Sequence, residues 1–200
     1  MNKLRCTLIG IHGKSSSGKD TLGIELSRAY ASLDIFAQRY AFADTLKDVC
    51  MEMFNLSSKY FHEEGLKNIP VAPWNVSPRQ IMQFVGTELV RNNIDKLLGT
   101  TAESLWITVL EQKLSHYKET ATVIITDVRF QDEYDWIIKN NGKIIHLTRP
   151  GYDGKVGIPS HQSEADINLH SKEKLYEIVN DGTFEDLENK VSKLIPSLVF

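Results

Sequence analysis

Cysteine, net charge and long apolar runs are all scarce in this sequence. The two cysteines, Cys6 and Cys50, lie in apolar segments without metal-ligand spacing, which predicts buried thiols in a reducing cytoplasm. A net charge of -3 gives no general attraction to nucleic acid or to an anionic membrane, so a polynucleotide partner is disfavoured. The apolar run from Leu4 to Ile11 stops at a glycine loop, too soon for a signal peptide or a membrane span.

Zinc and hydrolase chemistry also find little support. The six histidines show no metal-ligand spacing, and no serine stands on a nucleophile elbow. The segment from His161 to Glu164 is therefore read without a zinc or triad role, and Ser163 within it is interpreted as a helix cap. What remains is an ordinary globular composition of 200 residues, 42% hydrophobic and 24% charged, which predicts one domain with a sizeable core.

The most informative segment is a glycine- and serine-rich loop that fits the phosphate-binding pattern G-x-x-x-x-G-K-[ST] at every position but one. Its glycines let backbone N–H groups turn toward an anion, and the next helix adds its positive N-terminal end. A plain connection between strand and helix is the alternative. The predicted phosphate-binding residues are Gly13, Lys14, Ser15, Ser16, Ser17, Gly18, Lys19, Asp20 and Thr21.

Two residues of this loop are expected to contact the metal of a nucleotide. Asp20 stands where the pattern usually has a serine or threonine hydroxyl for Mg²⁺, and Thr21 comes one residue late. Mg²⁺ prefers oxygen ligands and retains waters, so contact by Asp20 or Thr21, direct or through water, is left open. Lys19 is expected to reach the β- and γ-phosphates.

Apolar strand patterns alternate with helical patterns along the chain. The predicted strands are residues 4–11, 39–43, 122–126, 143–148 and 175–179, and the predicted helices are residues 21–33, 45–54, 78–92, 102–118, 131–140 and 184–194. This order predicts an α/β fold with helices on both faces of a mainly parallel sheet. Ligands are then expected beyond the carboxyl ends of the strands.

Two long segments show neither pattern, which is uncommon in compact domains unless the segment is functional or flexible. The glycine-rich segment 149–166 is a candidate lid, with a plain surface loop as the equal alternative. The segment 55–76 is a candidate insertion on the substrate side.

Charged residues are expected where the predicted strands end. Asp127 follows the apolar run 123–126, a position where an acidic residue commonly meets the Mg²⁺ of a nucleotide. Arg129 is expected to point the same way, because alternate residues of an extended segment share a face. A structural ion pair is the alternative for Asp127 and Arg129. Further phosphate-binding candidates, each also typical of a solvated surface, are Lys47, Arg79, Arg91 and Arg149.

The helix predicted over 78–92 carries an apolar stripe that includes Ile81 and Phe84. Gly86 within it lowers the helix propensity and so predicts a close approach by another part of the structure. Trp106 and Phe84 are candidates to stack on a base, with burial in the core as an alternative of at least equal weight for each.

Together these motifs resemble the deoxynucleoside monophosphate kinase family of bacteriophages, within the P-loop nucleoside monophosphate kinases, over nearly the full chain. In that family the loop ends in Gly-Lys-Asp-Thr, as residues 18–21 do here. Residues 42–47 are similar to a segment near the acceptor phosphate, with Thr45 where the family usually has proline. Residues 79–88, ending in Gly-Thr-Glu, resemble the family's substrate helix.

The second half of the chain carries the rest of the resemblance. Residues 126–130 with Glu133 resemble the family's Asp-x-Arg segment, and Trp106 resembles an aromatic residue near its substrate. Residues 144–150 and the later His161 to Glu164 resemble its last core strand and lid, and the turn 180–182 also recurs there.

The resemblance implies a P-loop NTPase fold, a five-stranded parallel sheet flanked by helices with a short lid, in one domain over residues 1–200. It implies transfer of the γ-phosphate of ATP to a dNMP, with Mg²⁺ as cofactor, to supply DNA precursors. The implied partners are ATP and dNMP, with no nucleic acid polymer and no membrane. A homodimer, as in some members, and a cytoplasmic location, the host's if the chain is phage-encoded, are further expectations.

The resemblance also implies roles for individual residues. The implied catalytic residues are Lys19, Asp20, Asp127 and Arg129, and the implied metal ligands are Asp20, Thr21 and Asp127. The implied substrate-binding residues are Leu46, Lys47, Arg79, Gly86, Thr87, Arg91, Trp106, Asp127, Arg129 and Glu133, and the implied lid residues are Arg149, Lys155, His161 and Glu164. Two alternatives stay open: a phosphomevalonate kinase-like enzyme, which shares the Gly-Lys-Asp loop and the Asp-x-Arg segment, and a regulatory module that binds ATP without transferring phosphate.

Overall fold

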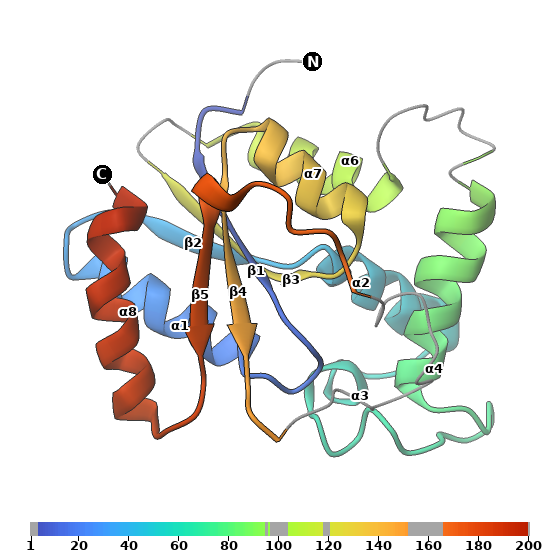
Figure 1. The fold of residues 1–200 in the computed structure, drawn as a ribbon. Helices are drawn as coiled ribbons and strands as arrows, with labels where there is room; N and C mark the ends of the chain where they lie inside the picture. The colour runs from blue at the N-terminus through green and yellow to red at the C-terminus, as the bar shows by residue number, and fades with distance from the viewer. Residues whose placement is uncertain (1–3, 95, 97–103, 118–120, 152–165, 200) are drawn as a thin grey trace. The chain divides into compact units, whose positions relative to one another are not determined.

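The computed structural model describes residues 4–94, 96, 104–117, 121–151 and 166–199 (Figure 1). The described residues form two compact units. The first lies within Met1–Ala41, Glu111–Gly154 and Asp166–Phe200, and the second within Phe42–Leu110. None of the described helices is both long and apolar enough to cross a membrane.

The first unit is built on a five-stranded parallel sheet. Its strands are β1 (Thr7–His12), β2 (Ala37–Tyr40), β3 (Thr122–Val128), β4 (Lys143–Thr148) and β5 (Leu175–Val179). They lie in the order β2-β3-β1-β4-β5, and every neighbouring pair is parallel. The predicted five-stranded parallel sheet flanked by helices is therefore confirmed.

Helices cover both faces of this sheet. The helices are α1 (Lys19–Ala31), α7 (Gln131–Lys139) and α8 (Phe184–Val199). On one face Ile9 and Ile11 of β1 pack in a single core with Leu26 of α1 and Val191 of α8. On the other face a Cβ added at Gly10 would lie 2.7 Å from Cδ1 of Ile137 in α7. The alternation follows from the pleat of β1, whose successive side chains point to opposite faces.

The second unit is helical. Its helices are α2 (Ala43–Phe54), α3 (Lys59–His62), α4 (Pro78–Gln83) and η1 (Phe84–Ile94), and α6 (Leu105–Leu114) leads from it into the first unit. Its core is formed by Cys50, Phe61, Ile81 and Val85.

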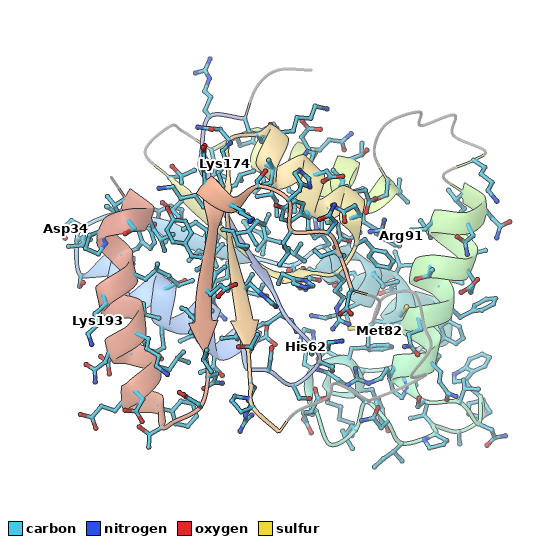
Figure 2. The ribbon with its side chains drawn as sticks, viewed as in Figure 1. Asp34, His62, Met82, Arg91, Lys174 and Lys193 are labelled. Carbon is cyan, nitrogen blue, oxygen red and sulfur yellow. The ribbon has the colours of Figure 1, made fainter. Side chains whose placement is uncertain are left out.

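The helix predicted over 78–92 begins where expected but changes its winding. Ser77 caps α4, because its hydroxyl accepts from the Gln80 N–H at 3.3 Å while Oε1 of Gln80 accepts from the Ser77 N–H at 2.9 Å. From Phe84 onward the chain is a π-helix, a rare wider form that is frequent at functional sites. Met82 and Arg91, labelled in Figure 2, mark the two parts of this segment.

Several elements begin or end a few residues away from their predicted bounds, and one segment predicted as irregular contains a helix. Ala43, predicted as the end of the second strand, is the first residue of α2, because β2 pairs with β3 only from Ala37 to Tyr40. The segment predicted as irregular over 55–76 contains the single-turn helix α3, whose Phe61 is fully buried. Burial of this one aromatic ring stabilises a turn too short to show a helical pattern.

The last helix also runs further than predicted. It continues through Pro196 to Val199, although proline lacks an N–H and usually ends a helix. Nζ of Lys143 donates to the carbonyls of Ser197 and Leu198 at 2.9 Å each, so contacts with β4 hold the last turn in place.

Both cysteines are free and buried, as predicted. Burial raises the pKa of the Cys50 thiol to about 12 and also raises that of Cys6. These thiols are therefore protonated and unreactive at neutral pH.

Candidate active site

The glycine loop connects the carboxyl end of β1 to the first turn of α1, as a phosphate-binding loop requires. Gly18 has φ +100, a left-handed conformation that side chains rarely adopt, and a Cβ at Gly13 would lie 2.4 Å from the Leu147 carbonyl oxygen. The Lys19 side chain folds back over the loop, where Nζ donates to the carbonyls of Gly13 and Lys14 at 2.7 Å each. The loop is thus compact, and it places an ammonium group over its own start.

Three side chains of the loop, those of Ser15, Ser17 and Lys19, are buried polar groups. Ser17 is 1% exposed and Lys19 8% exposed. The Ser17 hydroxyl has no hydrogen-bond partner among the described residues. A buried hydroxyl without a partner is costly, so this one fits a site that an anion completes.

The candidate metal ligands flank this loop. Asp20 is exposed in the first turn of α1 with Thr21 beside it. Asp127 immediately precedes Val128, which pairs with His12 at the entrance to the loop. Among the described residues no three histidines, cysteines or acidic residues group as a metal site. Mg²⁺ needs no such group, because it is usually bound by one or two carboxylates together with phosphates and waters, and these oxygen donors fit it in kind.

Glu133 hydrogen-bonds the backbone of the Asp-x-Arg segment. This carboxylate is 3% exposed, and its Oε2 accepts from the backbone N–H groups of Arg129 at 2.8 Å and Phe130 at 3.1 Å. Glu133 therefore fixes the backbone that carries Asp127 and Arg129.

Three further contacts reach the loop from segments that follow β4 and β5. Nη1 of Arg149 donates to the Ser16 carbonyl at 3.4 Å. Nζ of Lys14 pairs with Oδ1 of Asp166 at 3.0 Å. Nδ2 of Asn180 donates to the Ser17 carbonyl at 2.9 Å. The sequence shows Asn180 only as part of a turn, and the parallel sheet brings that turn to the edge that carries the loop. The predicted lid residues Lys155, His161 and Glu164 lie outside the described residues.

In the second unit the guanidinium of Arg79 is buried and held on two sides. Arg79 is 8% exposed; Nη2 donates to Oε1 of Glu64 at 2.6 Å and Nε donates to Oδ1 of Asn68 at 2.8 Å. Burial alone would raise the pKa of Glu64, but hydrogen bonds and positive charge from Lys67 and Arg79 lower it overall. Glu64 and Asn68 lie in the segment without a pattern, so the sequence gives no signal for them.

Gly86 is the point of close approach that the sequence predicts. A Cβ there would lie 2.7 Å from Cδ2 of Leu46, so glycine lets η1 pack against α2. The indole Nε1 of Trp106 donates to the Gly86 carbonyl at 3.1 Å, and Trp106 is 6% exposed. Phe84, at 60%, is the exposed member of the two candidate stacking aromatics.

The remaining substrate candidates also lie in the second unit. Thr87 is buried in η1, Arg91 is half-buried further along it (Figure 2), and Nζ of Lys47 pairs with Oδ1 of Asp44 at 3.3 Å. The phosphate-loop candidates and the Asp-x-Arg segment thus occupy the first unit, and the other substrate candidates the second.

Comparison with known proteins identifies the family. The family model for deoxynucleotide monophosphate kinase matches residues 60–191 of the chain. The chain belongs to the deoxynucleotide monophosphate kinase family. A protein of Acanthamoeba polyphaga mimivirus that carries the family's name is 32% identical over 195 residues, 92% of this chain and 93% of that protein. The deoxynucleotide monophosphate kinase of Enterobacteria phage T4 is 27% identical over 126 residues, 62% of this chain and 47% of the phage protein.

The chain spans about half the length of the phage T4 relative and nearly all of the mimivirus one. Among solved structures, a gluconokinase from Sinorhizobium meliloti covers 98% of this chain and 95% of its own, with a TM-score of 0.47 and 9% identity. At that score the likeness adds no argument about function. The family match does not favour the phosphomevalonate kinase-like alternative.

In this kinase family member, a histidine directly before the phosphate loop gives a prediction about pH. Nδ1 of His12 lies 2.9 Å from the carbonyl oxygen of Val128. The centroid of the His12 ring lies 5.4 Å from the centroid of the His146 ring. Burial lowers the pKa of His12 most; the hydrogen bond to Val128 and the charge of Asp166 raise it, and the charges of His146 and Lys19 lower it further. The net shift is downward, so the folded state favours the neutral ring.

The unfolded chain therefore takes up a proton near pH 6.5 that the folded chain takes up only at lower pH. We expect the free energy of unfolding to be largest above that pH and to fall as the pH drops below it. His12→Gln keeps a donor for the Val128 carbonyl but has no ring to protonate. Its free energy of unfolding, measured by urea unfolding, is therefore expected to fall less than that of the wild type between pH 7.5 and 5.5. An equal decrease in both proteins would show that His12 is not its source.

Proposed function

We propose that this chain transfers the γ-phosphate of ATP to a deoxynucleoside monophosphate, giving ADP and the dNDP for DNA synthesis. The observation that carries the proposal is the 32% identity with the mimivirus relative over 92% of this chain and 93% of that protein. The compact loop with Lys19 folded over it supports the same chemistry. We further propose that both units belong to one kinase domain with an insertion near residues 55–76 and a lid near residues 149–166.

The donor phosphates are proposed to bind at the loop. The backbone N–H groups of residues 15–18 would hold them, and Lys19 would follow the transferring phosphoryl group. Lys19 is already buried and hydrogen-bonded in place, so little reorganisation is needed for it to act. Bound Mg²⁺, held by Asp20, Thr21 or Asp127, would neutralise charge on the β- and γ-phosphates.

The acceptor needs no protein base. Its phosphate has a second pKa of about 6, so it is largely ionised at neutral pH and its oxygen can attack directly. Catalysis is then alignment and neutralisation of charge. We propose that four cations hold the acceptor or neutralise the transition-state charge, and that one of two further cations contributes from the proposed lid: Lys47, Arg79, Arg91 and Arg129 for the first task, and Arg149 or Lys155 for the second. The contacts of Arg79 with Glu64 and Asn68 support this, because they orient its guanidinium in advance.

Coupling of ATP cleavage to the acceptor tests the proposal. Water competes with the acceptor, and a site that excludes water suppresses ATP hydrolysis. We expect slow ADP release with Mg²⁺ and ATP alone and a large increase when one or more dNMPs are added. A high basal rate that no dNMP changes would contradict this, ATP binding without ADP release would indicate a regulatory module, and stimulation by phosphomevalonate alone would indicate the other kinase class.

The proposed partners are ATP and dNMP, with no nucleic acid polymer, and the proposed location is the cytoplasm, the host's if the chain is phage-encoded. The net charge of -3 supports the absence of a polymer partner. A homodimer is the proposed assembly, because some members of the bacteriophage kinase family that this sequence resembles are homodimers.

A further inference from the structure

Asn180 contacts the phosphate loop from the carboxyl end of β5, the outermost strand on its side of the sheet. It directly follows β5, and Nδ2 donates to the Ser17 carbonyl at 2.9 Å across 163 residues of sequence. The same nitrogen would lie 2.7 Å from a Cβ at Gly18, so the amide packs directly against the second glycine of the loop. We propose that Asn180 is a positioning residue that orients the Ser17–Gly18 peptide for phosphate binding.

The geometry of the peptide bond explains how one amide can do this. The Ser17 carbonyl and the Gly18 N–H belong to one planar unit, and in a trans peptide they point in opposite directions. A donor that holds the carbonyl outward therefore turns the Gly18 N–H toward the inside of the loop. Inward-pointing N–H groups are what bind phosphate oxygens in such loops.

Asn180 is itself anchored, so it can impose this orientation. Its backbone N–H donates to the Thr148 carbonyl at 2.7 Å, which extends the β4–β5 pairing by one residue. On the other side, Nζ of Lys190 in α8 donates to the Val179 carbonyl at 2.7 Å and to Oδ1 of Asp181. The turn is therefore tied both to the sheet and to α8.

A role confined to the turn does not account for this amide. An asparagine that only forms a turn commonly hydrogen-bonds its own backbone two residues on. Here Nδ2 of Asn180 donates to the Ser17 carbonyl instead, and the start of α8 is capped separately, since the N–H and hydroxyl of Thr183 donate to Oδ2 of Asp186 at 2.7 and 2.8 Å. The side-chain amide of Asn180 therefore bonds the phosphate loop and not its own turn.

The inference rests on the proposed binding of ATP at the loop, and its test compares Asn180→Asp with a matched control. Aspartate keeps the shape but has no donor for the Ser17 carbonyl; because its charge would also repel an anion, the neutral variant Asn180→Ala isolates the loss of the donor. The control is Asn140→Asp, because Nδ2 of Asn140 also donates to a backbone carbonyl, that of Trp136, at 2.9 Å, and lies far from the loop in sequence. Equilibrium binding of ATP and of tripolyphosphate is measured for both variants and for Asn180→Ala, alongside the melting temperature.

We expect Asn180→Asp and Asn180→Ala to lower the affinity for ATP by about tenfold or more. In each variant the affinity for tripolyphosphate is expected to fall by a similar factor. Asn140→Asp is expected to bind both ligands as the wild type does. The two aspartate variants are expected to lose similar thermal stability. Loss of ATP affinity with unchanged tripolyphosphate affinity would overturn the proposal, because Asn180 would then contact the nucleoside. Unchanged affinity for both ligands would also overturn it.

Turnover separates this inference from the proposed function. In the ADP-release assay, kcat/KM for ATP is expected to fall about tenfold or more in Asn180→Asp, with KM for the dNMP nearly unchanged. A wild-type protein that binds tripolyphosphate but phosphorylates no dNMP would refute the proposed function. The binding comparison would still decide the role of Asn180.

Discussion

Lys19→Ala is expected to lower kcat with ATP and a dNMP by at least about 10²-fold while the protein stays folded, because it removes charge that stabilises the transferring phosphoryl group. In the structure Nζ of Lys19 donates to the Gly13 and Lys14 carbonyls at 2.7 Å each, so the ammonium is held where the phosphates are proposed to bind. The measurement is the steady-state rate of ADP release, together with the melting temperature of each protein.

Lys143→Ala is a matched control for this prediction. Nζ of Lys143 likewise donates to two backbone carbonyls, those of Ser197 and Leu198 at 2.9 Å each, but on the C-terminal helix. It is expected to cost stability without lowering kcat by more than a few fold. Near-normal turnover in folded Lys19→Ala would rule out the role proposed for Lys19.

Among the variants described here, Gly13→Ala is expected to lower the free energy of unfolding most and to abolish tight ATP binding. The added Cβ would lie 2.4 Å from the Leu147 carbonyl oxygen and 3.0 Å from Oγ of Ser17. The first of these is a backbone atom of β4, so either the loop or the strand end must move. Overpacking of this kind typically costs about 1–3 kcal/mol.

Gly65→Ala is the control, because nothing lies within 4 Å of a Cβ at that position. Its free energy of unfolding is expected to stay within about 0.5 kcal/mol of the wild type. Urea unfolding and ATP binding are measured for both variants. If Gly13→Ala matched the wild type in both, the close approach of the loop to β4 would not be a constraint on the protein.

The strands could be predicted because their signal is local. Residues such as Ile124 and Ile145 lie in short apolar β-rich runs, and strands buried on both faces need just such runs. Gly86 was predictable for a related reason: a glycine inside a helical pattern indicates a close neighbour, here Leu46, although the pattern does not say which neighbour. The loop was predictable because phosphate binding restricts both residue types and spacing.

The features that the sequence did not show depend on contacts between distant segments. Arg79 was predicted as a phosphate-binding candidate, with a solvated surface charge as the alternative; its partners Glu64 and Asn68 come from a segment with no periodicity. The hydrogen bond from Asn180 to Ser17 requires the parallel pairing of β1, β4 and β5, which places the carboxyl ends of β1 and β5 at one edge. The passage of α8 through Pro196 depends on its packing and on Lys143. Local preference is a weak guide wherever such tertiary contacts decide.

The central claim is that the γ-phosphate moves from ATP to a dNMP, and the most direct measurement follows that phosphate. The protein is incubated with Mg²⁺, ATP labelled in its γ-phosphate, and dGMP, dTMP, dCMP or dAMP, with ribose counterparts and phosphomevalonate in parallel. The account predicts label in one or more dNDPs with the wild type and almost none with Lys19→Ala. Label found only in inorganic phosphate, only in the phosphomevalonate product, or only in unreacted ATP would contradict it.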